Sequence, residues 1–223
     1  MPVNRFFYDG VLEKVVTLEG DEHHHLAHVM RNKKGNSVEL VNGKGFLAVG
    51  EVIEIQKREA QIEIKSLSES KPRLPPLKVI QALPKLSHLE WILQKGTELG
   101  VSHFYLFHSQ QSEKKALTPH QDKRLQLVLK NAMKQCGRLD LPSLEWGFPK
   151  VEGPAFFGDL SEGAPLLKEV ACLPATLIIG PEKGFTNVEI EELRPIARGV
   201  RIAPYTLRAE TAAIAAIAQL CQS

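Results

Sequence analysis

Hydrophobic residues in the first third of the chain occur at every second position or in short runs, a pattern typical of β-strands. Apolar and polar residues alternate over 60–65, and two apolar-containing runs occupy 37–41 and 46–55. Asn42-Gly43 lies between these runs and favours a hairpin, because both residues tolerate positive φ. Gly50, inside the second run, indicates a bulge or bend. This region is therefore predicted to be β-rich.

A proline-rich segment, residues 71–76, separates this region from the rest of the chain. Its prolines cannot continue a helix or a central strand, so they favour an extended linker. Residues 1–70 are predicted to form a small antiparallel β-barrel or sandwich with one short helix near 21–31. Residues 77–223 are predicted to form a second domain.

The second region alternates apolar runs with helical patterns. Strands are expected at 77–83, 101–107, 176–179 and 200–203, with helices between several of them and a last helix over 210–221. Ser87 with Glu90, and Thr186 with Glu189, have the spacing of capping boxes. Gly100 is placed where a glycine ends a helix, and the surroundings of residues 144 and 156 show no clear pattern. Strand–helix alternation predicts an α/β fold with a mostly parallel sheet.

The composition is that of an ordinary globular protein, with 223 residues, 43% hydrophobic and 24% charged. A formal net charge of +2 favours no class of partner by itself. The three cysteines lie far apart without a C-x-x-C motif, which fits a reducing cytoplasm and predicts neither disulfides nor a zinc site. His24 and His28 have helical i, i+4 spacing but no evident third ligand, so no metal is expected. No signal peptide or membrane span is predicted.

One candidate site follows the apolar run that ends at Ile179. The segment Gly180-Pro181-Glu182-Lys183-Gly184 comes directly after it and precedes a helix start. Ligands of open α/β sheets bind at the carboxyl ends of strands, and glycines let a ligand approach the backbone. The spacing is neither G-x-G-x-x-G nor a Walker loop. The segment is thus either a different ligand loop or an ordinary strand–helix turn.

A second candidate is Leu207-Arg208-Ala209-Glu210-Thr211, which precedes an alanine-rich helix. Arg208 offers a fork of donors suited to a phosphate or a base carbonyl. Glu210 has two interpretations. It either stabilises the first turn of the helix through the dipole, or it acts as an acid–base group.

Basic residues gather in two places that are candidates for nucleic-acid binding. One strip runs from Lys114 to Arg138, and a smaller group comprises Arg5, Arg31, Lys33 and Lys34. Clustered positive charge is typical of phosphate-backbone binding, although many such runs are only solvated helix faces. The aromatic residues 6–8 either stack on bases or belong to the core.

Several short motifs, taken in order, resemble one family over nearly the whole chain. They are Arg5-Phe6-Phe7, His25-Leu26 through Arg31 and Gly35, the Asn42-Gly43 hairpin, Gln94 through Val101, Gln135-Cys136-Gly137-Arg138, Ile179-Gly180-Pro181-Glu182 and Leu207 through Thr211. Their combination is similar to the RsmE-type bacterial 16S rRNA uridine-N3 methyltransferases, within the SPOUT superfamily.

This resemblance implies a PUA-like β-barrel, a trefoil-knotted α/β domain and a cytoplasmic homodimer whose substrate is 16S rRNA or the small ribosomal subunit. It also implies that S-adenosylmethionine (SAM) is bound in the knot by two loops. The first loop comprises Ile179, Gly180, Pro181, Glu182 and Gly184, and the second comprises Ile202, Ala203, Leu207 and Arg208. RNA contacts are expected from Arg5, Arg31, Lys33, Lys95, Lys114, Lys115 and Arg138. Arg208 is expected to orient the base or a phosphate, with Glu210 as an acid–base or orienting group.

Two departures from the family pattern qualify these expectations. Lys183 stands where the family usually has glycine, so it is strained if that position needs a positive φ, or else it meets the cofactor carboxylate. Gln110-Gln111-Ser112 replaces a common Glu-Arg-Ser and removes an arginine that would bind RNA phosphate. The alternative functions are methylation of a different RNA nucleoside, such as one in tRNA, and RNA binding without catalysis.

Overall fold

The structure, a computed structural model, describes residues 4–112 and 116–221. It forms two compact units. The first comprises the residues up to Pro72 together with Lys130–Leu141, and the second comprises Arg73–Leu129 together with the residues from Pro142 onward.

The first unit contains a curled sheet and one short helical segment. Its elements are β1 (Arg5–Phe7), β2 (Val15–Glu19), α1 (Gly20–His24), the π-helical turn η1 (His25–Val29), β3 (Ser37–Val41), β4 (Phe46–Ile55) and β5 (Glu59–Glu69). The five strands have the order β1-β3-β4-β5-β2. Neighbours are antiparallel except β1 and β3, which are parallel because the chain crosses through β2 and the helix between them. In the described residues the sheet is therefore a half-barrel, with one parallel pair in place of the expected all-antiparallel barrel.

Glycines in and around β4 shape this half-barrel. Gly43 and Gly45 in the hairpin turn have φ values of 72° and 92°, which confirms the turn signal. Gly50 lies at a register shift between β4 and β5, so the expected bulge is confirmed. A Cβ atom on Gly50 would lie 2.5 Å from Ile62 Cγ2, so the close approach of the strands requires glycine there. The core inside the curl includes the fully buried Phe6, Leu26, Leu40 and Ile62.

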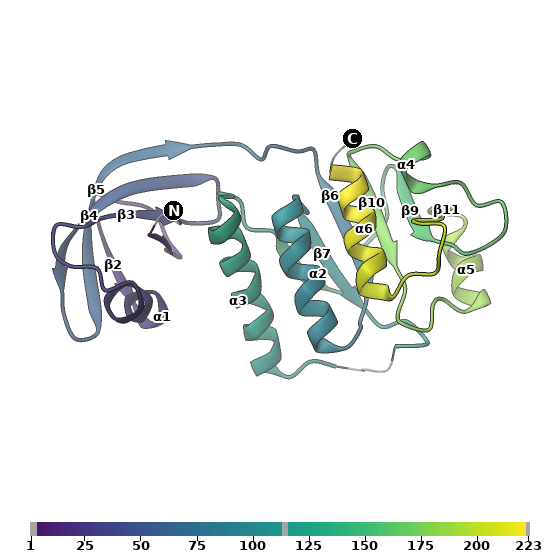
Figure 1. The fold of residues 1–223 in the computed structure, drawn as a ribbon, viewed down its shortest axis with the longest axis horizontal. Coiled ribbons are helices and arrows are strands. Elements are labelled where there is room, and N and C mark those ends of the chain that lie inside the picture. The colour runs from purple at the N-terminus through teal and green to yellow at the C-terminus, as the bar shows by residue number, and fades with distance from the viewer. Residues whose placement is uncertain (1–3, 113–115, 222–223) are drawn as a thin grey trace. The chain divides into compact units, whose positions relative to one another are not determined.

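The second unit is built on a parallel sheet with helices against it (Figure 1). Its elements are β6 (Leu77–Ala82), α2 (Leu86–Leu99), β7 (His103–Phe107), α3 (Pro119–Cys136, whose last residues belong to the first unit), β8 (Ser143–Trp146), β9 (Ala155–Gly158), α4 (Leu167–Val170), β10 (Ala175–Ile179), α5 (Asn187–Leu193), β11 (Arg198–Val200) and α6 (Ala209–Cys221). The strand order is β11-β9-β10-β6-β7-β8, and all neighbouring strands are parallel. The predicted parallel α/β sheet is confirmed.

The chain connections from β6 and from β10 run to opposite edges of the sheet. β6 continues through α2 to β7 on one side, whereas β10 continues through α5 to β11 on the other. The carboxyl ends of these strands form a topological switch point, where open α/β sheets bind ligands. Helices α2 and α6 lie side by side (Figure 1), and α5 contributes Leu193 to a core with Ile80, Phe157 and Ile178.

Two predicted boundaries are wrong. Helix α2 begins at Leu86 without a side-chain cap, so Ser87 already lies in its first turn, and Glu90 pairs with Arg124 instead of closing a capping box. Strand β11 ends at Val200, whereas Arg201 forms only an isolated bridge with Leu166 and residues 202–203 lie in a bend. The other helix signals are confirmed. The Thr186–Glu189 capping box is present, and Gly100 ends α2 with a φ of 114°. None of the helices in the described part of the chain could cross a membrane.

Candidate functional site

A cavity of about 400 Å³ opens at the carboxyl ends of β9, β10 and β11. Its walls come from residues 158–161 after β9, residues 179–185 after β10, and residues between β11 and the start of α6. The volume is in the range of small-molecule sites, about 300–1,000 Å³. The cavity lies next to the switch point of the sheet, where the sequence predicts a ligand.

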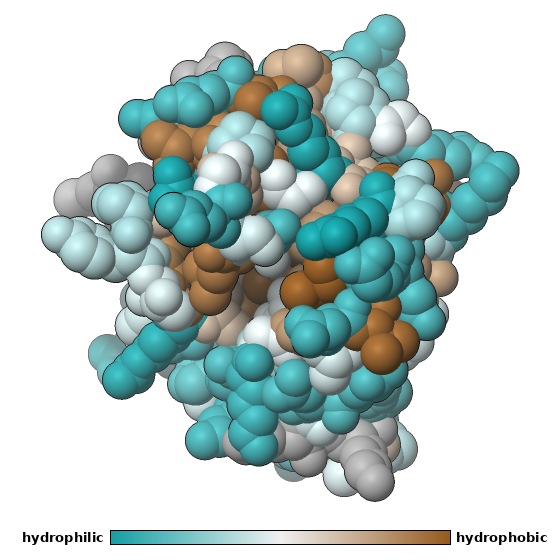
Figure 2. Space-filling model, turned by 90° about the vertical axis from the view of Figure 1, so that its right-hand side faces the viewer, coloured by the Kyte–Doolittle hydropathy of each residue, from teal (hydrophilic) through white to brown (hydrophobic). Residues whose placement is uncertain are grey.

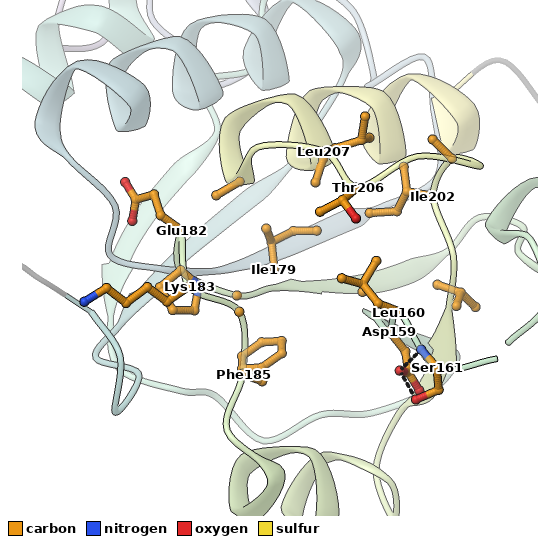
Figure 3. A pocket seen from close by; sticks show the side chains of 18 of the residues that line it. Asp159, Leu160, Ser161, Ile179, Glu182, Lys183, Phe185, Ile202, Thr206 and Leu207 are labelled. Carbon is orange, nitrogen blue, oxygen red and sulfur yellow. Dashed lines mark hydrogen bonds between the residues drawn. The ribbon is translucent and has the colours of Figure 1, made fainter.

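The interior of the cavity is mainly apolar. Ile179, Phe185 and Leu207 face it from different walls (Figure 3), and hydrophobic side chains surround a hollow on this side of the molecule (Figure 2). Among the polar residues that line it is Asp159, whose Oδ1 accepts hydrogen bonds from the Ser161 backbone N–H at 2.8 Å and from its hydroxyl at 2.6 Å. Apolar walls with few placed polar groups are typical of binding sites for small organic molecules.

The loop after β10 is a tight turn that exposes backbone to the cavity. Gly184 has a φ of 76°, and its N–H donates to the Pro181 carbonyl at 2.9 Å. Arg31 is the one non-glycine residue with positive φ in the described ranges, so the strain considered for Lys183 does not occur. The Lys183 side chain is exposed and points away from the cavity (Figure 3). The positive φ that the turn requires falls one position later, on glycine.

Most residues predicted to hold the cofactor line this one cavity. They are Ile179, Gly180, Pro181, Glu182, Gly184, Ile202, Ala203 and Leu207. Arg208 is not among the lining residues, and its side chain is exposed next to Leu207. Sequence reasoning missed the wall at 158–161, together with Phe185 and Thr206. The signal for Phe185 was its position directly after the glycine turn, whereas the segment after β9 has no comparable local signal.

A histidine and two glutamates meet beside the loop. Glu182 Oε1 accepts a hydrogen bond from the Lys85 backbone N–H at 3.1 Å and lies 3.4 Å from His88 Nδ1. The same His88 atom lies 3.5 Å from Oε2 of Glu210, in the first turn of α6. Burial raises the pKa of Glu182, but the hydrogen bonds from the Lys85 backbone and from His88 together lower it by more than burial raises it. The pKa of Glu182 therefore lies below the ordinary value. Glu210 therefore takes part in a side-chain cluster as well as lying in the first turn of a helix.

A second buried carboxylate anchors the helix that follows the loop. Glu189 accepts hydrogen bonds from the backbone N–H groups of Thr186, at 2.8 Å, and Gln110, at 2.9 Å. Gln110 begins the segment that departs from the family pattern. Its backbone is thus tied to the start of α5.

Some of the predicted RNA-binding residues form ion pairs with acidic side chains, and others have exposed side chains. Arg5 is mostly buried in an ion pair with Glu39 at 2.6 Å, Lys95 pairs with Glu98 at 2.9 Å, and Arg138 pairs with Asp140. Arg31 and Lys33 have exposed side chains, and Lys114 and Lys115 lie outside the described residues. Phe6 and Phe7 are buried, so they belong to the core and do not form a stacking surface. In the described part of the chain no cluster of metal-ligating side chains is found.

Comparison with known families accounts for both units. The family described as RNA methyltransferase domain matches residues 71–152 and 156–221, and the family described as RNA methyltransferase PUA domain matches residues 18–65. The chain belongs to the RNA methyltransferase family. The half-barrel is accordingly PUA-like, and the predicted fold class and enzyme class are confirmed. The trefoil knot stays a prediction.

Two relatives of this RNA methyltransferase carry the same name. Ribosomal RNA small subunit methyltransferase E of Bacillus subtilis is 28% identical, with 92% of this chain and 88% of the relative covered. The enzyme of the same name from Synechocystis is 29% identical over 95% of this chain and 74% of its own length.

Solved structures show the same fold. A predicted RNA methyltransferase from Thermotoga maritima has a TM-score of 0.81 at 25% identity, covering 98% of this chain and 97% of that one. Ribosomal RNA small subunit methyltransferase E from Neisseria gonorrhoeae, solved bound to SAM, has a TM-score of 0.84 at 24% identity, covering 97% and 95%.

Proposed function

We propose that this RNA methyltransferase uses SAM to methylate N3 of a uridine in 16S rRNA. The observation that carries the proposal is that two loops far apart in the sequence, 179–184 and 202–207, line one cavity. These are the loops to which the family resemblance assigns SAM. The relatives that match almost the whole chain act on ribosomal RNA of the small subunit, as their name states.

The cavity suits SAM in size and chemistry. Its apolar side chains, Ile179, Phe185 and Leu207, match an adenine ring. Asp159 is a carboxylate that can accept hydrogen bonds from ribose hydroxyls or from an ammonium group. When bound, SAM supplies an activated methyl group. The chain's own contribution is to hold both partners in line, and such positioning can supply about 7–11 kcal/mol of a reaction barrier.

We propose that Arg208 orients the acceptor. Arg208 lies in the sequence between the wall residues Leu207 and Ala209, its side chain is exposed, and in the described residues it forms no ion pair. A fork of donors in that position can hold a base carbonyl or an adjacent phosphate. Uridine N3 must lose its proton before it can act as a nucleophile, so fixing the base relative to the proton acceptor matters as much as fixing the methyl donor.

The PUA-like unit is proposed to bind RNA through its exposed cations. Arg31 and Lys33 follow η1 and are exposed, so they can contact phosphates. We further propose that the enzyme acts in the cytoplasm as a homodimer, with residues 71–76 as the linker between its domains.

Nucleoside mass spectrometry tests the proposal. The protein is incubated with SAM and either deproteinised 16S rRNA, assembled small subunits or tRNA, all from cells that lack the modification. We expect N3-methyluridine in 16S rRNA from at least one small-subunit substrate. Methylation of tRNA alone would identify a different RNA nucleoside as the target. SAM that neither binds in calorimetry nor yields a methylated nucleoside would leave RNA binding without catalysis.

A further inference from the structure

We propose that His88 is a positioning residue that fastens the cofactor loop to the start of α6 by bridging Glu182 and Glu210. The inference rests on the proposed function, because it assigns a purpose to the loops that line the cavity. We call the three side chains the clasp.

The clasp joins three elements that are far apart in the sequence. His88 lies in the first turn of α2, Glu182 lies in the loop after β10, and Glu210 lies in the first turn of α6. One atom, His88 Nδ1, is 3.4 Å from Glu182 Oε1 and 3.5 Å from Glu210 Oε2. The two glutamates belong to the two segments that supply facing walls of the cavity. A single side chain thus lies close to one glutamate from each of the two segments.

The surroundings of Glu210 call for a positive charge. Its side chain is only 13% exposed, and its Oε2 is buried and accepts no hydrogen bond from the described residues. A buried carboxylate oxygen without a donor is costly unless a cation lies beside it. Glu182 adds a second negative charge at the same point. A neutral imidazole has one N–H and can serve one carboxylate at a time, whereas imidazolium also offsets the repulsion between the two.

The clasp acts on the loop backbone and not on the ligand. Figure 3 shows the Glu182 side chain directed away from Ile179 and Phe185, toward the outside of the cavity. The neighbouring glycines, Gly180 and Gly184, have no side chains that could hold the turn in place. Anchoring Glu182 therefore fixes the backbone that lines the cavity. Anchoring Glu210 fixes the chain two residues after Arg208, and with it the position of the orienting guanidinium.

Other charged groups around His88 come from the same helix and its neighbours. Lys85 precedes α2 and donates its backbone N–H to Glu182. Glu90, in the next turn, is paired with Arg124 of α3. A substitution at His88 therefore changes both the charge and the hydrogen bonding beside the two glutamates.

Two substitutions separate charge from hydrogen bonding. His88→Gln keeps a donor without charge, and His88→Lys supplies a permanent cation. His120→Gln, at an exposed histidine in α3, is the matched control. Amide hydrogen exchange of residues 182–184 is measured in the SAM-free protein, and the dissociation constant for SAM is measured by calorimetry, both at one fixed pH so that the intrinsic exchange rate is the same for every variant.

We expect His88→Gln to raise the dissociation constant for SAM about tenfold, with faster exchange of the loop, because a neutral amide cannot offset the charges of the two glutamates. His88→Lys should keep the wild-type affinity and exchange, and His120→Gln should match the wild type. The proposal is overturned if His88→Gln exchanges and binds like the wild type, or if His88→Lys is impaired as much as His88→Gln. A wild-type protein that does not bind SAM at all would refute the proposed function instead, while the exchange comparison would still test the clasp.

Discussion

Replacing Glu189 by glutamine tests whether a buried carboxylate holds the start of α5 and the segment beside it. Glu189 is only 9% exposed. One carboxylate oxygen accepts the Thr186 N–H at 2.8 Å and the other accepts the Gln110 N–H at 2.9 Å. A glutamine side chain has one acceptor oxygen and one NH₂ group, so one of these two backbone donors would face another donor.

The expected loss follows from that single mismatch. A hydrogen bond to a charged group contributes about 1.5–3 kcal/mol, so the free energy of unfolding should fall by about 2 kcal/mol at pH 7. For a unit of this size that corresponds to a decrease in Tm of roughly 4–8 °C. The effect should be confined to the second unit, where Thr186, Gln110 and Glu189 all lie.

The pH dependence provides a sharper test than the magnitude. Burial raises the pKa of Glu189, but hydrogen bonds from Thr186, Ser109 and Gln110 together lower it by more than burial raises it. The folded-state pKa of Glu189 therefore lies below the ordinary value of 4.5. A lowered carboxylate pKa stabilises the fold above the unfolded-state pKa, and this stability is lost as the pH falls through the folded-state pKa. The difference between wild type and Glu189→Gln should therefore be complete at pH 7 and shrink as the solution is acidified below pH 4.5.

Urea unfolding followed by tryptophan fluorescence measures this difference, because both tryptophans, Trp91 and Trp146, belong to the second unit. Glu191→Gln on the same helix is the control. Its side chain is 68% exposed and pairs with Arg194, so less than about 1 kcal/mol is expected. A Glu189→Gln loss no larger than that of the control, or one that is the same at pH 7 and in acid, would refute the reasoning.

Three further predictions concern catalysis, RNA binding and helix termination. Arg208→Ala should bind SAM as the wild type does in calorimetry but methylate rRNA at least about a hundredfold more slowly, and an unchanged rate would remove its orienting role. Arg31→Ala and Lys33→Ala should each weaken RNA binding whatever the RNA sequence. Each should also lower the magnitude of the slope of log affinity against log salt concentration by about 1, and an unchanged slope would show that the replaced residue does not contact phosphate. Gly100→Ala should lower the free energy of unfolding, measured in urea, by about 1–3 kcal/mol, because the φ of Gly100 is 114° and a Cβ there would lie 2.6 Å from Leu74 Cδ1. An unfolding free energy equal to that of the wild type would contradict this prediction.

Local sequence signals predicted the parts of the fold that depend on local geometry. The Thr186–Glu189 box and Gly100 are examples, because a cap or a left-handed residue acts within one turn. The same reasoning failed at Ser87, since the helix starts earlier and an identical spacing then falls inside the first turn. Strands β8 and β9 have only four residues each, too few for a period to be recognised, and pairing with neighbours decides their structure.

In the candidate site, too, local features were predictable from the sequence and features made by distant segments were not. Loops next to strongly apolar strands, such as 179–184, are recognisable because a glycine turn after a buried run is a local feature. Asp159 could not be found this way, because it enters the cavity only when β9 inserts between β10 and β11. His88 could not be found either, since both of its partners come from distant segments.

The side chains that hold the cavity in shape are mostly not those that face it. The Glu182 carboxylate accepts a hydrogen bond from the Lys85 backbone N–H and lies beside His88. The Glu189 carboxylate accepts a hydrogen bond from the Gln110 backbone N–H. The surface offered to the ligand is instead glycine backbone and apolar side chains, which contribute shape but little orientation of their own. Ligand affinity should therefore respond to substitutions behind the walls as strongly as to those in front. Catalysis should respond further to Arg208, an exposed cation directly after the wall residue Leu207. An enzyme whose reaction depends on alignment would be expected to place its charged groups in this way, because fixed backbone aligns a donor at no further entropic cost.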